Sequence, residues 1–169
     1  MYRYHKQQRE KQRLTVIQTG LDALIQGNLQ ILEKHEIRDA LPTTLRDLLL
    51  EGKAEEADNL LMRVVTGLQH ATPSIRRSTL ATLAAISEHL ADMEQWDRLE
   101  KLLPALQQGL RKEGVEELPV QQALAAIGSL AGHHLAEERY ARAADTAQVL
   151  WEFSAQDPTA DSTPPFVRQ

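Results

Sequence analysis

The chain has 169 residues, a net charge of −5 at pH 7, 42% hydrophobic residues and no cysteine. This length can bury about two-thirds of the unfolded surface in one core, and the missing cysteine excludes disulfides and thiolate metal sites. No apolar run approaches the roughly 18 residues that a membrane-spanning helix needs, and no signal peptide precedes the first helix. We therefore expect a cytoplasmic protein. The scarcity of aromatic residues, 4%, favours helices packed through Leu, Ala and Ile.

Charge is distributed unevenly along the chain. Residues 1–13 contain five basic side chains and one acidic side chain, or +4, which leaves −9 for the remainder. An acidic body disfavours general binding of nucleic acid. The basic N-terminal arm nevertheless keeps the binding of nucleic acid or another anionic surface as an alternative function.

A long amphipathic helix is predicted from about His5 to Glu36, because the segment contains no proline and its seam residues recur at spacings of three and four. The seam consists of Leu14, Ile17, Leu21, Leu24, Asn28 and Ile31. Such a helix either caps its own chain or pairs with a second copy as a homodimer, and the sequence leaves both open. Gly20 and Gly27 each cost a helix roughly 1 kcal/mol relative to Ala, which disfavours a free-standing coiled coil.

Two shorter helices are predicted next. The dipeptide Leu41-Pro42 interrupts the first pattern and begins a short helix, which Gly52 ends near its C-terminus. A second helix extends from Lys53 to about His70, with apolar residues at helical spacing. Their short connection predicts that the two helices form an antiparallel pair.

The best-formed helix is predicted over residues 72–90, with Thr72 as its N-cap and Pro73 at its first position. A further helix follows the joint at Asp92 and continues to Gly114, with a kink or interruption expected at Pro104. The last two predicted helices span residues 119–135 and 137–153. Residues 155–169 are polar and rich in proline, which is typical of a disordered tail or linker.

An internal repeat relates these helices. The aligned positions are Ile75 with Val120 and His89 with His134 at a shift of 45, Trp96 with Tyr140 at a shift of 44, and Ala54 with Trp96 in an earlier, more degraded copy. Periods of 40 to 47 residues built from two helices are typical of α-solenoids, in which each helix pair must stack on its neighbours. The sequence therefore predicts three helix pairs.

The first helix of the middle pair resembles the first helix of a HEAT repeat, where a proline is followed by a β-branched residue, an arginine and small or apolar residues at helical spacing. The residues that carry the resemblance are Pro73, Ile75, Arg76, Thr79, Leu83 and Ile86. The third copy departs from the motif, with Gln121 and Gly128 at the aligned positions. A tetratricopeptide array is disfavoured, because a 34-residue period does not superpose the segments.

This resemblance, which covers residues 41–153, implies an all-α fold: a right-handed α–α superhelix of about three helix pairs preceded by one long N-terminal helix. The expected domain organisation is a basic arm and long helix over residues 1–40, HEAT-like repeats over 41–154, and the tail over 155–169. In such repeats Arg76 is expected to hydrogen-bond between repeats. Trp96 and Tyr140 are expected to wedge between helices with only their polar edges exposed.

No constellation for catalysis or for a cofactor can be assembled from the sequence. Phosphate-binding loops, nucleophile elbows and HExxH motifs are absent. His89 and His134 lie near helix C-termini, where the helix dipole favours a histidine, so we interpret them as structural. We therefore expect a protein that is not an enzyme and has no catalytic, cofactor-binding or metal-binding residues.

The function predicted from the sequence is that of a non-catalytic scaffold or protein-interaction module. Its contacts are expected on the second helix of each pair, which would line a concave face. The candidate partner-binding residues, chosen as polar and outward-facing, are Arg63, Asp97, Arg98, Lys101, Arg142 and Asp145. Binding of nucleic acid or an anionic surface through the arm is the alternative.

Overall fold

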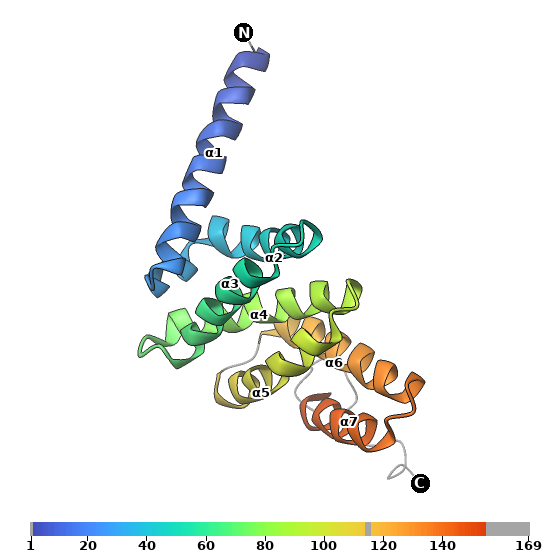
Figure 1. Ribbon diagram of the computed structural model, residues 1–169. Helices are drawn as coiled ribbons and strands as arrows, with labels where there is room; N and C mark the ends of the chain where they lie inside the picture. Colours follow the sequence, from blue (N-terminus) through green and yellow to red (C-terminus); the bar gives the residue numbers. More distant parts are fainter. Residues whose placement is uncertain (1, 114–115, 155–169) are drawn as a thin grey trace. The chain divides into compact units, whose positions relative to one another are not determined.

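The computed structural model describes residues 2–113 and 116–154, and within them every regular element is helical (Figure 1). The all-α fold class is therefore confirmed. The predicted tail over residues 155–169 lies outside the described residues. The chain forms two compact units, which are described separately, and the division between Thr79 and Leu80 falls inside helix α4 (Pro73–Asp92).

The first unit begins with α1 (Tyr2–Ile25), followed by the 3₁₀ helix η1 (Leu29–Glu33). The predicted helix to Glu36 was therefore wrong in length. Gly27 adopts a φ of +98°, and the N–H of Asn28 donates to the carbonyl of Ala23 at 2.9 Å. This left-handed termination ends a helix, and glycine adopts it without steric cost.

Helix α2 (His35–Leu50) then contains Pro42 in its interior, so the prediction that Pro42 begins this helix was wrong. The helix continues because Ile37, Leu41 and Leu45 are almost completely buried around the proline, and this burial offsets the lost backbone hydrogen bond. Likewise α5 (Trp96–Lys112) continues without interruption through Pro104.

The remaining elements are α3 (Ala54–Thr66) and η2 (Gly67–Gln69) in the first unit, and α6 (Glu117–Ala136) and α7 (Tyr140–Ser154) in the second. The pairs α2–α3, α4–α5 and α6–α7 are each connected by three residues. In all three connections the middle residue has a positive φ; these residues are Gly52 at +76°, Glu94 at +56° and Glu138 at +59°. They are separated by 42 and 44 residues.

The hydrogen bonds of the three connections also match. The N–H of the third connecting residue donates to the carbonyl five residues earlier; the bonds are Lys53 to Leu48 at 2.9 Å, Gln95 to Leu90 at 2.8 Å and Arg139 to His134 at 2.8 Å. Such a bond, reaching back over a left-handed residue, is the Schellman termination of a helix. The same backbone geometry thus turns the chain between the two helices of every pair.

Burial follows the same spacing. Buried positions of α4 recur in α6 at a shift of 44; the pairs are 75 and 119, 79 and 123, 82 and 126, 83 and 127, 86 and 130, and 90 and 134. Positions of α2 and α3 match α4 and α5 at a shift of 42; the buried pairs are 37 and 79, 41 and 83, 45 and 87, 57 and 99, 60 and 102, and 64 and 106. The alignment of His89 with His134 at a shift of 45 was wrong, because burial and hydrogen bonds place His134 with Leu90.

In the first unit, the second half of α1 packs on the chain itself. Leu24 is fully buried and Leu21 nearly so. Gly20 permits a close approach to α2, since a Cβ atom at this position would lie 2.8 Å from Cγ1 of Ile37. In the second unit, α6 and α7 lie side by side (Figure 1). Their buried side chains, including Ile127 and Phe153, form a core with those of α5.

Candidate functional site

Five of the six candidate partner-binding residues lie in the second unit. Asp97 and Lys101 are exposed on α5, and Arg142 and Asp145 are exposed on α7. Arg98 is half-buried, and its Nη1 donates a hydrogen bond to Oε1 of Gln95 at 2.7 Å. Arg63 is exposed on α3, which belongs to the first unit.

Glu100 connects the two helices that carry these residues. Its Oε2 lies 3.9 Å from Nη1 of Arg142, and its Oε1 lies 3.1 Å from Nε2 of His134. His134 is only 1% exposed, and its contact with Glu100 lacks the alignment of a hydrogen bond. Sequence reasoning did not find Glu100, because a single carboxylate on a charged helix face carries no distinguishing signal.

An aromatic contact lies close to this carboxylate. The indole ring of Trp96 stacks on the imidazole of His133, with ring centroids 4.5 Å apart and planes inclined by 12°. Trp96 is half-buried, as a wedge between helices requires. The same expectation was wrong for Tyr140, which is 63% exposed.

A second polar cluster connects α5 to the end of α7. Nη2 of Arg111 donates to Oε2 of Glu152 at 2.9 Å, and Nε2 of Gln107 donates to the same oxygen at 3.2 Å. The hydrogen bonds from Arg111 are the main reason that the pKa of the Glu152 carboxyl lies below its usual range. The same pairing raises the pKa of Arg111. This cluster stabilises the packing of α7 rather than offering a reactive group.

Two hydrogen bonds of Arg76 lie close to it in the sequence, and the bond between repeats that the resemblance implies stays a prediction. Nη1 of Arg76 donates to the carbonyls of His70 and Ala71, both at 2.9 Å. These bonds lie within the loop that precedes α4, and Thr72 at the start of α4 donates its N–H to Nδ1 of His70 at 3.0 Å. The arginine therefore fixes the entry of its own helix.

The seam predicted for a homodimer is not one continuous exposed surface. Leu21 and Leu24 are buried in the first unit, whereas Leu14 remains 66% exposed. Asn28 and Ile31 lie beyond the end of α1, so they cannot extend a helical seam. Pairing of two copies stays a prediction only through Leu14 and Ile17, the seam residues of α1 that are not buried.

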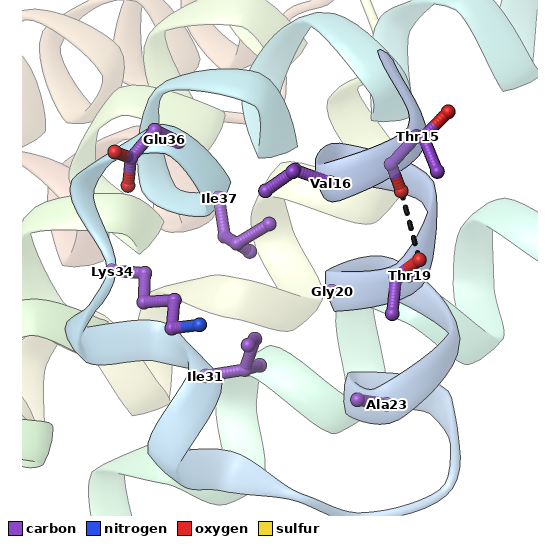
Figure 2. A pocket seen from close by; sticks show the side chains of 9 residues that line it. All are labelled: Thr15, Val16, Thr19, Gly20, Ala23, Ile31, Lys34, Glu36 and Ile37. Atoms are coloured by element: carbon purple, nitrogen blue, oxygen red, sulfur yellow. Dashed lines mark hydrogen bonds between the residues drawn. The ribbon is translucent and has the colours of Figure 1, made fainter. Parts of the chain in front are cut away.

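A cavity of about 290 Å³ opens between α1, η1 and α2 (Figure 2). Val16, Ile31 and Ile37 point into it, and Lys34 and Glu36 lie along its edge. A second cavity, of about 410 Å³, flanks the other side of α1 and is lined by Leu21, Ile25 and residues of α2 and α3. Both linings combine apolar side chains with charged ones, which are Lys34 and Glu36 in the first cavity and Lys53 and Glu56 in the second.

The described residues contain neither a metal-binding cluster nor a membrane-spanning helix. Within residues 2–113 and 116–154, no three His, Asp or Glu side chains gather in a way that could hold a metal ion. Among the helices of the same ranges, none combines the length and apolar character of a membrane span. Comparisons of the chain with protein-family models, curated protein sequences and solved structures returned no match.

Proposed function

We propose that the chain is a HEAT-like helical-repeat module that binds a protein partner and performs no catalysis. The observation that carries this proposal is the recurrence of one connection and one burial pattern in three helix pairs, at separations of 42 and 44 residues. Repeated helix pairs generate extended surfaces whose exposed side chains differ from pair to pair, and such surfaces are typically used for protein recognition.

The binding surface proposed within the second unit comprises the exposed charges of α5 and α7 around Glu100. Lys101 and Asp145 are exposed, and Arg142 adds a cation beside the carboxylate of Glu100. A surface with both signs of charge selects partners through complementary charges, which raise the association rate and fix the orientation of docking. Arg63 on α3 would serve the same function in the first unit.

The test exchanges the charges of this surface without altering the net charge. The variant Lys101→Glu/Asp145→Lys is compared with the control Arg46→Glu/Asp47→Lys, which makes the equivalent exchange on the exposed face of α2. Proteins captured by each variant from the native cell are quantified by mass spectrometry, and circular dichroism verifies that both variants fold. We expect the first variant alone to lose a specific partner. Capture at the wild-type level by the first variant would exclude the proposed surface.

A further inference from the structure

The first half of α1 is a helix without packing partners in the first unit. Residues 2–16 are all exposed, and Tyr2 reaches 84% exposure. Figure 1 shows these turns extending away from α2 and α3. At 1.5 Å per residue, the exposed segment is about 22 Å long. The segment continues the helix whose second half is packed through Gly20, Leu21 and Leu24.

The middle of this segment is polar, and its exposed apolar side chains, Tyr2, Tyr4, Leu14 and Val16, lie at its two ends. Between Tyr4 and Leu14 there is no apolar residue, and the interval contains three glutamines and a single acidic residue, Glu10. Four of the five basic residues recur at spacings of three, three and four, which places them on one helix face; they are Arg3, Lys6, Arg9 and Arg13. With about 100° of rotation per residue, Glu10 falls on the same face, between Arg3 and Lys6, so the arm presents a predominantly basic ridge that includes one carboxylate.

The outer end of this ridge lies far from the packed part of the first unit. Arg3 precedes Gly20, the first buried residue of α1, by 17 positions, or about 26 Å along the helix. The Debye length at physiological ionic strength is about 8 Å. The charges on α2 and α3 are therefore screened from the outer turns of the arm. The acidic composition of the body consequently does not prevent the arm from attracting a polyanion.

The composition of the ridge distinguishes between classes of anionic partner. A protein partner that receives a helix in a groove requires apolar anchors at helical spacing, and a membrane surface requires an apolar helix face. Residues 5–13 provide neither, and the apolar residues of the arm, Tyr2, Tyr4, Leu14 and Val16, are confined to its two ends. Interfaces with nucleic acids are polar and strongly basic, with Arg and Lys on phosphates and Gln on phosphates or base edges. His5, Gln7, Gln8 and Gln12 complement the cations in this respect.

We propose that residues 2–16 of α1 form a nucleic-acid-binding arm in which Arg3, Lys6, Arg9 and Arg13 contact the phosphate backbone. The arm makes the protein able to bind nucleic acid independently of the protein-binding surface proposed for α5 and α7. Phosphate contacts alone carry no sequence information, so the arm contributes affinity that depends on charge and salt rather than on a fixed base sequence.

The experiment measures binding of the full chain to a fluorescently labelled RNA hairpin and to a DNA duplex, by anisotropy at a series of salt concentrations. Four phosphate contacts predict a slope of log K against log salt of roughly −3.6, or a ~150-fold loss of affinity between 50 and 200 mM salt. The arm variant Arg3→Gln/Lys6→Gln/Arg9→Gln/Arg13→Gln should abolish this binding. All four side chains are exposed, so the fold should persist, as circular dichroism verifies.

A matched control removes the same charge elsewhere, at the exposed residues of Arg46→Gln/Lys53→Gln/Arg77→Gln/Lys112→Gln. Binding that is lost in the arm variant and retained in the control supports the proposal. Equal affinities of the two variants, or no saturable binding of either nucleic acid by the wild type at 50 mM salt, would overturn it. Polyglutamate and phosphatidylserine vesicles are tested in parallel. Binding to one of these probes with no binding to either nucleic acid would assign the arm to an acidic protein or a lipid surface instead.

Discussion

The substitution of glycine by alanine should have opposite effects on stability at two glycines of the chain. Gly52 lies at the left-handed position between α2 and α3, with a φ of +76°, whereas Gly132 is an exposed residue inside α6. At both positions, a Cβ atom added to the glycine meets no other atom within 4 Å. The substitution Gly→Ala therefore reports backbone conformation alone, with no contribution from packing.

The magnitudes follow from the two conformations. An L-residue in the left-handed region costs roughly 1–2 kcal/mol. Alanine also restricts the unfolded chain more than glycine does, which offsets about 0.4–1 kcal/mol of this cost. Gly52→Ala should therefore destabilise the first unit by about 1 kcal/mol. In a helix interior, alanine is favoured over glycine by about 0.5–1 kcal/mol. Gly132→Ala should thus stabilise the second unit by about that amount.

Urea unfolding followed by circular dichroism measures both effects. The free energy of unfolding is compared with that of the wild type at constant slope, so that a change in the midpoint reports stability. Because the two glycines lie in different units, each variant is expected to shift the transition of its own unit. An unchanged or higher midpoint in Gly52→Ala would refute the left-handed assignment of this connection. It would also remove the main support for three equivalent helix pairs.

Three further predictions concern packing and charge. Gly20→Ala should destabilise the first unit by about 1–2 kcal/mol in urea unfolding, because the added methyl group would crowd Ile37. Since Arg111 lowers the pKa of Glu152, the carboxylate stabilises the fold above its unfolded pKa and loses this effect as the pH falls through the folded pKa. Glu152→Gln should therefore lower the melting temperature at pH 7, with the difference shrinking as the pH falls below the unfolded glutamate pKa of about 4.3. His134→Leu should change stability by less than about 1 kcal/mol in thermal unfolding, since it removes two buried nitrogens that make no hydrogen bond together with the 3.1 Å contact between Nε2 and Oε1 of Glu100.

Periodicity in the sequence was sufficient to predict the helices but not all of their ends. The seam at spacings of three and four continued through Asn28 and Ile31, so it predicted helix beyond the residue at which α1 ends. The end of α1 depends on the positive φ of Gly27 and on one backbone hydrogen bond. The spacing of apolar side chains does not reveal either feature. At Pro42 the sequence predicted the start of a helix, whereas the structure has the interior of one. The burial of the neighbouring side chains outweighs the backbone hydrogen bond that the proline removes.

The candidate site was only partly predictable for a related reason. Exposure of Lys101, Arg142 and Asp145 follows from their positions opposite the apolar stripes of α5 and α7, and these residues are exposed in the structure. The contacts of Glu100 instead depend on the register between α5 and the α6–α7 pair. Identities such as histidine with histidine favoured a shift of 45, whereas packing selects 44, and a shift of one residue rotates a helix by about 100°.

The non-glycine residues in the connections show which property recurs among the pairs. Glu94 and Glu138 occupy the left-handed conformation that Gly52 occupies in the first pair. Such a conformation persists in a non-glycine residue only where the surrounding hydrogen bonds and packing determine it. Here the bonds of the connection recur in all three pairs although the side chains differ. Backbone geometry and buried positions are therefore the repeated features, and the outward residues of each second helix are free to differ. That freedom allows α5 to present Lys101 where α7 presents Asp145, and such differences are what a protein-binding surface requires for specificity.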